Sequence, residues 1–167
     1  MVERSVHIGE ATGSSPVSST SKIKSMSSDP NVKVKALFAC IDWRLHPQLE
    51  NYFINNGLGC DLCVTAGSVK SLIDPATQGF LLEQIAISKK LHNCQAVVLT
   101  MHMDCGAYGG SKAFGGNDAE VANCTRQLNL AKAIVERNFP GLPVESFIIN
   151  LEKGEAGWNI KPVKIQI

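Results

Sequence analysis

The chain has 167 residues, of which 44% are hydrophobic and 19% are charged. This composition allows one domain with an apolar core and excludes an intrinsically disordered polymer, which has few apolar residues and a high net charge. With 16 basic and 15 acidic residues the formal net charge is +1, so the sequence lacks the basic character of a protein that binds nucleic acid.

Neither a membrane segment nor a secretory signal is evident in the sequence. No apolar stretch approaches the ~18 residues that a membrane-spanning helix needs, and the N-terminus has no continuous apolar core. We therefore expect a cytoplasmic protein without a membrane partner. In that reducing compartment the six cysteines are expected to be thiols or metal ligands rather than disulfides.

Residues 1–30 differ in composition from the rest of the chain, because they contain nine serines and no periodic apolar pattern. This stretch is expected to be a disordered, serine-rich extension. It could be a targeting peptide, although acidic Glu3 and Glu10 are unusual in the mitochondrial type. We favour an extension without function, upstream of a translation start at Met26. Residues 31–167 are expected to form a single α/β domain.

Strands and helices are predicted to alternate from residue 32 onward. A nearly continuous apolar run over 34–39 predicts a strand buried on both faces. A helix is predicted to follow from His46, with Pro47 in its first turn and Gly57 at its C-terminal cap. Residues 60–66 are expected to form a second, short strand.

The second half of the chain continues this alternation. A helix is predicted over 75–91, the clearest strand over 95–101, and the longest helix over 117–138, where apolar residues recur at steps of three and four. Residues 144–151 form a predicted fourth strand, and 158–167 a candidate fifth. Such alternation indicates a mostly parallel central sheet of four to five strands, flanked by helices.

Unusual residues follow two of the predicted strands. Cys40, Asp42 and Arg44 come after the first strand, and His102 and Cys105 come after the third. In open α/β sheets the functional site lies beyond the carboxyl ends of the strands. If these two strands are neighbours, the two cysteines and the histidine can converge.

Two thiolates and one imidazole are a ligand set that zinc prefers, and three protein ligands leave a fourth position open, as in catalytic zinc sites. Each residue alone has a simpler explanation, with Cys40 as a buried thiol and His102 as a loop histidine. Their joint occurrence at two strand ends favours a metal site.

The two segments resemble the zinc motif of the β-class carbonic anhydrases, which is Cys-x-Asp-x-Arg after one strand and His-x-x-Cys-Gly after another. Both halves are present, starting at Cys40 and at His102. The pair Ala66-Gly67 is similar to an Ala-Gly pair that the family carries in a loop beside its active site. The resemblance covers about residues 33 to 115 and is weak beyond them.

The resemblance implies a β-carbonic-anhydrase-like fold, with Zn²⁺ bound by Cys40, His102 and Cys105. It also implies reversible hydration of carbon dioxide to bicarbonate by a zinc-bound hydroxide. Asp42 would accept a hydrogen bond from that hydroxide, and Arg44 would keep Asp42 ionised through a bidentate pair. If the pair breaks, Asp42 can occupy the fourth zinc position and stop the reaction. Family members are homodimers or higher homo-oligomers, so the same is expected here.

Two alternatives stay open at this stage. The glutamine and the aromatic residues that line the carbon dioxide pocket in the family cannot be assigned here, so the same zinc site could instead hydrolyse COS or CS₂. A non-catalytic zinc-binding protein of the same fold would keep Asp42 as a permanent fourth ligand. Trp43 replaces the serine usual in the family, and we expect it to pack against the sheet.

Other cysteines have a structural interpretation. Cys60 and Cys63 form a Cys-x-x-Cys pair, a spacing typical of redox and zinc sites, but within a strand they would point to opposite faces. We therefore expect them to be structural thiols. Cys94 and Cys124 are expected in the core. Tyr108, in the glycine-rich loop after the third strand, is a candidate for the lining of the pocket.

Overall fold

The computed structural model describes residues 32–155 and 157–166, so the predicted disordered extension lies outside the described residues. Five strands form one sheet in the order β2-β1-β3-β4-β5. Neighbouring strands are parallel except for the antiparallel pair β4–β5, which confirms the mostly parallel sheet. The strands are β1 (Lys33–Cys40), β2 (Leu58–Thr65), β3 (Ala96–His102), β4 (Val144–Gly154) and β5 (Gly157–Ile165).

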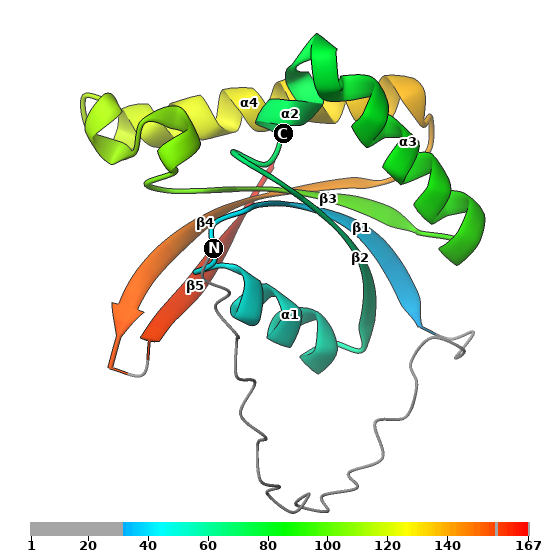
Figure 1. Ribbon diagram of the computed structural model, residues 1–167, viewed down its shortest axis with the longest axis horizontal. Coiled ribbons are helices and arrows are strands. Elements are labelled where there is room, and N and C mark those ends of the chain that lie inside the picture. Colours follow the sequence, from blue (N-terminus) through cyan, green and yellow to red (C-terminus); the bar gives the residue numbers. More distant parts are fainter. Residues whose placement is uncertain (1–31, 156, 167) are drawn as a thin grey trace, which may run out of the picture.

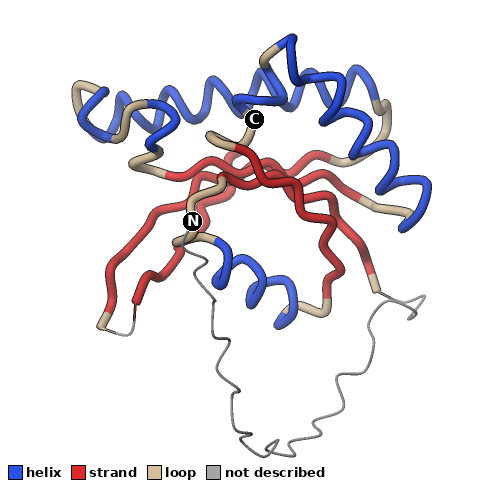
Figure 2. The backbone as a smooth tube through the Cα atoms, in the orientation of Figure 1, coloured by secondary structure: helices blue, strands red, loops and turns tan. Residues whose placement is uncertain are grey.

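Helices cover both faces of the sheet unequally. Among the described residues, one α-helix lies beneath the concave face and three pack on the opposite face (Figure 1; Figure 2 shows the same layers in tube form). The lone helix is α1 (His46–Asn55), and the other three are α2 (Lys70–Ile73), α3 (Pro75–His92) and α4 (Asn117–Asn138). The flanking helices predicted from the sequence are confirmed, and α2 is an additional, short one.

Local sequence explains where the helices begin and end. Pro47 lies in the first turn of α1, where its missing N–H costs nothing. Gly57 follows the end of this helix with a φ of 62°, a left-handed conformation that favours glycine. The N-cap of α3 is Asp74, whose carboxylate accepts a hydrogen bond of 2.9 Å from the Ala76 N–H. Its C-cap is Asn93, which also has a left-handed conformation.

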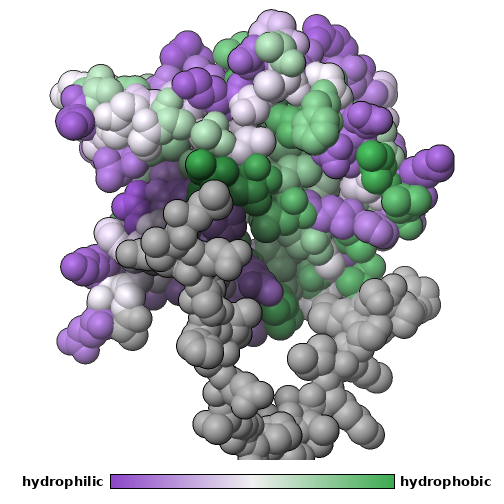
Figure 3. Space-filling view, in the orientation of Figure 1, coloured by the Kyte–Doolittle hydropathy of each residue, from purple (hydrophilic) through white to green (hydrophobic). Residues whose placement is uncertain are grey.

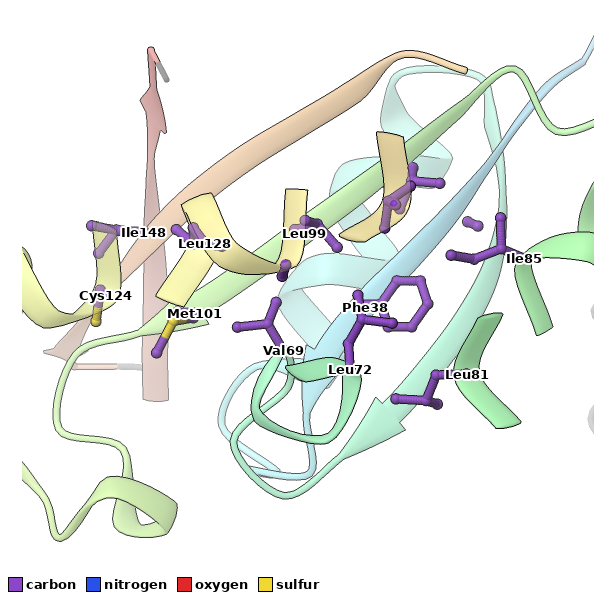
Figure 4. Close-up of a cluster of buried hydrophobic side chains, with 14 of the residues drawn as sticks. Phe38, Val69, Leu72, Leu81, Ile85, Leu99, Met101, Cys124, Leu128 and Ile148 are labelled. Carbon is purple, nitrogen blue, oxygen red and sulfur yellow. The ribbon is translucent and has the colours of Figure 1, made fainter. Parts of the chain in front are cut away.

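Alternate residues of the strands build two apolar clusters, one on each face of the sheet. The larger lies between the sheet and the three helices, where Phe38, Leu99 and Leu128 meet (Figure 4). The smaller lies between α1 and the sheet and contains Leu37 and Phe53. Burial of side chains from both faces of β1 and β3 agrees with the continuous apolar runs in their sequences.

Several expectations about single elements need correction or extension. The last strands form a hairpin, in which β4 continues to Gly154 and β5 begins at Gly157. None of the helices in the described part of the chain is long and apolar enough to span a membrane.

Candidate metal centre

The predicted ligands meet at the carboxyl ends of two neighbouring strands. Strands β1 and β3 are paired in parallel. Cys40 is the last residue of β1, His102 is the last of β3, and Cys105 lies in the turn that follows. All three side chains are buried, and their potential ligand atoms lie within 4.8 Å of one another. The structure therefore brings together the three residues that could hold a metal ion.

The two sulfur atoms lie close together and take part in hydrogen bonds. Cys40 Sγ and Cys105 Sγ are 3.9 Å apart as free thiols, and the Gly67 N–H donates to Cys40 Sγ at 3.4 Å. Hydrogen bonding from the Cys105 thiol, which outweighs burial, lowers the pKa of Cys40. The same contact raises the pKa of Cys105. One sulfur is thus readily a thiolate, and a bound cation would displace the proton from the other.

His102 presents an unpaired nitrogen to this cluster. Its Nδ1 lies 2.9 Å from the Met103 carbonyl oxygen, so Nδ1–H is the donor. Its buried Nε2 has no hydrogen-bond partner among the described residues. A buried polar atom without a partner costs free energy. A metal ion would be a suitable partner, because metal-bound histidines commonly donate their other ring N–H to a carbonyl or carboxylate.

Asp42 and Arg44 form a bidentate ion pair beside the cluster. Arg44 Nε lies 2.9 Å from Asp42 Oδ1, and Arg44 Nη2 lies 2.6 Å from Asp42 Oδ2. The backbone N–H of Arg44 also donates to Oδ1 at 3.1 Å. The Arg44 guanidinium therefore holds the pKa of Asp42 below its usual range. Asp42 Oδ2 is 3.9 Å from His102 Nε2, so the carboxylate borders the candidate metal position.

Glu120 is a site residue that the sequence did not identify. It lies in the first turn of α4 and its side chain is 3% exposed. Its carboxylate accepts hydrogen bonds of 2.6 Å from both the Asp104 backbone N–H and the Ser111 hydroxyl. Because Asp104 precedes Cys105, this carboxylate fixes the loop that carries a candidate ligand. The sequence did contain a sign of this role. Glu120 lies four positions before Cys124, so it is a charged residue on the apolar stripe of the predicted helix.

The expectation that Trp43 packs against the sheet is wrong. Trp43 is 71% exposed, because it lies in the turn between β1 and α1 where Asp42 and Arg44 turn inward. A different tryptophan reaches the site. The guanidinium carbon of Arg44 lies 4.9 Å from the centroid of the Trp158 ring on β5. No local pattern in the sequence connects these two residues.

Gly67 and Tyr108 shape the surroundings of Cys40. Gly67 has a φ of 75°, and a Cβ placed on it would lie 3.0 Å from Ala107 Cβ and 3.2 Å from Tyr108 Cε2. Glycine is therefore required both by the backbone conformation and by the close approach. Tyr108 packs between the two apolar clusters, and its hydroxyl is buried without a hydrogen-bond partner among the described residues.

The Cys-x-x-Cys pair does not join the site. Cys60 packs against the smaller apolar cluster and Cys63 against the larger one, so the two side chains point to opposite faces of β2. This confirms their structural interpretation. Cys94 and Cys124 are buried in the core, as expected.

Comparison with known proteins gives the family of the chain. A family model described as "Putative carbonic anhydrase" matches residues 30–163. The match extends through most of β5, well beyond the part in which the sequence motifs are evident. The chain belongs to this carbonic anhydrase family, and the resemblance stated from the two half-motifs is confirmed.

Similar proteins include two uncharacterized rickettsial chains. One, from Rickettsia conorii, is 32% identical over 124 residues, which cover 70% of this chain and 67% of that one. The other, from Rickettsia bellii, is 27% identical over 124 residues, covering 70% and 76% of the two chains.

The solved structures with a similar fold include two β-carbonic anhydrases. Isoform I from Trichomonas vaginalis has a TM-score of 0.47 and 15% identity, with 78% of this chain and 81% of that chain covered. A tetrameric enzyme from Sordaria macrospora has a TM-score of 0.44 and 14% identity, with 84% and 86% covered.

Proposed function

We propose that this protein is a zinc-dependent carbonic anhydrase that interconverts carbon dioxide and bicarbonate. The observation that carries the proposal is the buried cluster of Cys40, His102 and Cys105, in which a histidine nitrogen lacks a partner among the described residues. Membership of the chain in a carbonic anhydrase family supports the same conclusion.

The donor set and its spacing support zinc as the metal. Thiolate and imidazole ligands are typical of tetrahedral zinc sites. Two sulfurs, each about 2.3 Å from a tetrahedral zinc ion, lie about 3.8 Å apart. The separation between Cys40 Sγ and Cys105 Sγ is 3.9 Å. When bound, zinc supplies a Lewis acid that lowers the pKa of a water molecule towards ~7.

Asp42 and Arg44 supply the orientation that the reaction needs. As an ionised carboxylate, Asp42 would accept a hydrogen bond from the attacking oxygen and direct its lone pair at the carbon of CO₂. A new C–O bond then forms, one C=O electron pair moves to its oxygen, and bicarbonate results. Arg44 keeps the Asp42 carboxylate ionised and fixed through the bidentate pair. The proton released in each cycle passes to buffer.

The proposal also includes the compartment, the assembly and the partners of the protein. We expect it to act in the cytoplasm as a homo-oligomer, with CO₂ and bicarbonate as its small-molecule substrates and no nucleic-acid or membrane partner. An exposed apolar residue on an edge strand, Leu62 of β2, supports contact with a second copy.

Zinc content and stopped-flow CO₂ hydration test the function together. The purified wild type is expected to bind about one zinc per chain, the number that one three-ligand site can hold. It should hydrate CO₂ at about pH 7 and about pH 8.5. Cys105→Ser should lose both the zinc and the activity, because it removes one thiolate ligand. Cys60→Ser, on an adjacent strand outside the cluster, is the matched control and should keep both.

Two outcomes would overturn this proposal. A zinc-loaded wild type that hydrates CO₂ no faster than buffer at either pH would reject carbonic anhydrase activity, and the same sample would then be assayed with COS and CS₂. An active Cys105→Ser variant with full zinc would reject the ligand assignment.

A further inference from the structure

The Asp42–Arg44 pair has a third partner from a distant part of the chain. Trp158, near the start of β5, presents its ring to the Arg44 guanidinium, whose carbon lies 4.9 Å from the ring centroid. The Trp158 carbonyl accepts a hydrogen bond of 2.9 Å from Gln48 Nε2 on α1. The hydrogen bond from α1 therefore fixes the tryptophan backbone beside the arginine.

We propose that Trp158 is a positioning residue, which holds Arg44 and through it keeps the Asp42 carboxylate off the metal. This inference rests on the proposed function, because it concerns the same zinc site. An indole ring is the most favourable aromatic partner for a cation above its face. The guanidinium is planar, and it bonds the carboxylate through N–H groups in its plane while its face remains available for stacking.

The two contacts of Arg44 therefore reinforce each other. Asp42 occupies the in-plane donors Nε and Nη2. Trp158 restricts tilting of the guanidinium plane, and that plane sets the direction of the carboxylate. Without the ring, Arg44 would lose the restraint on its orientation, and its ion pair with Asp42 would break more readily.

The distances show why this orientation matters. Asp42 Oδ2 is 3.9 Å from His102 Nε2. A carboxylate oxygen is itself a good zinc ligand, so small rotations would bring Asp42 into competition with water for the open position. Trp158 thus favours the state in which the carboxylate binds arginine rather than metal.

Cobalt-substituted protein gives a test that does not depend on activity. The visible absorption of Co²⁺ reports its ligands, so Trp158→Ala should change the spectrum as Asp42 enters the coordination sphere. Adding Asp42→Asn to Trp158→Ala should abolish that change relative to Asp42→Asn alone. In the zinc enzyme, Trp158→Ala should lower kcat about tenfold with KM changed less than twofold; tenfold corresponds to about 1.4 kcal/mol.

Three further variants separate positioning from packing. Trp158→Phe keeps a weaker aromatic face and should partly restore both the spectrum and kcat. Trp158→Leu keeps apolar volume without that face, and should behave like the alanine variant; it also serves if Trp158→Ala does not fold. Trp43→Ala removes the exposed tryptophan next to Arg44 and should leave spectrum and kcat unchanged.

The results distinguish this inference from the proposed function. A wild-type cobalt spectrum in folded Trp158→Leu, or wild-type kcat in it, would overturn the positioning role while leaving carbonic anhydrase activity intact. An inactive, zinc-loaded wild type would overturn the function, and the cobalt spectra would still report whether Trp158 controls Asp42.

Discussion

Glu120 is a single buried charge that supports the candidate metal centre without contacting it. Its carboxylate is removed from water at the start of α4, where such burial is costly unless hydrogen bonds replace hydration. The Asp104 N–H and the Ser111 hydroxyl supply those hydrogen bonds. A carboxylate in the first turn of a helix is also favoured by the helix dipole. The burial of Glu120 is therefore compensated locally, and the compensation orders the loop around Cys105.

Removal of this carboxylate should loosen the loop. We predict that Glu120→Ala lowers the free energy of unfolding by about 2 kcal/mol, because it removes a buried carboxylate that accepts hydrogen bonds from the Asp104 N–H and the Ser111 hydroxyl. Zinc affinity should fall as well, since Cys105 loses its fixed position. Glu120→Gln retains an amide oxygen and should lose less of both. Urea unfolding and competition with a zinc chelator measure the two effects.

Glu83→Ala, on the exposed side of α3, is the matched control for a lost glutamate. It is expected to change neither quantity measurably. Equal stability and zinc affinity in Glu120→Ala and Glu83→Ala would show that the loop does not depend on Glu120.

Residues differ in how far sequence alone can assign them to the site. The convergence of Cys40, His102 and Cys105 was predictable because these residue types are unusual at strand ends and the strand ends are identifiable in the sequence. Trp158 was not, because its place over Arg44 depends on how β5 folds back along β4. The prediction for Trp43 was wrong because its position next to Arg44 in the sequence does not determine the direction of a side chain in a turn.

At the scale of elements, the strand β2 carries two thiols whose surroundings differ from those of Cys40 and Cys105 at the candidate metal centre. Burial, with smaller contributions from Asp61 and Cys63, raises the pKa of Cys60 to about 12 from an ordinary 9.0. Burial also raises the pKa of Cys63. Neither thiol is activated as a redox pair requires.

Alkylation kinetics test the state of this strand. At pH 8 the raised pKa reduces the thiolate fraction of Cys60 about a thousandfold relative to an unshifted thiol. We predict that iodoacetamide modifies Cys60 in the native protein about a thousandfold more slowly than in urea-unfolded protein. The native rate should still rise with pH above 9, where the rate of an unshifted thiol levels off. Mass spectrometry of quenched samples measures the modification at each cysteine.

The unfolded chain provides the reference rate for every thiol in the same experiment. Equal rates for Cys60 in the native and unfolded chains would contradict the assigned burial. So would rapid formation of a disulfide between Cys60 and Cys63 on mild oxidation, because side chains on opposite faces of a strand cannot meet.

Helices and strands with long, regular apolar patterns were predicted more accurately than short ones. Strand β3 and helix α4 have long, regular apolar patterns, and their predicted bounds differ little from those observed. Helix α2, Lys70–Ile73, is too short to show a period. The predicted fourth strand ends at residue 151, so the hairpin between β4 and β5 was not predicted. The observed strands are separated by only two residues, which allow an antiparallel pair but no crossover.

The whole molecule has one thinly covered face. Of the helices in residues 32–155 and 157–166, only α1 lies beneath the concave side of the sheet (Figure 1). It leaves a groove along β2, whose lining includes Ile54, Leu58 and Leu62. Figure 3 shows hydrophobic side chains over β2 and α3 on this view of the surface. In the described part of the chain β2 pairs only with β1, so its outer edge offers free backbone groups beside apolar side chains.

This edge is where we expect a second copy to bind. Leu62 on β2 is 49% exposed, and Val163 on β5, at the opposite edge of the sheet, is 48% exposed. Sedimentation equilibrium at micromolar concentrations should show a homodimer or a larger assembly for the wild type. Leu62→Lys should dissociate it, because a charge on an edge strand opposes pairing between sheets.

Val163→Lys, equally exposed, is the matched control and should leave the β2 contact intact. A wild type that is monomeric at every concentration would refute assembly, and dissociation by Val163→Lys alone would place the contact on β5.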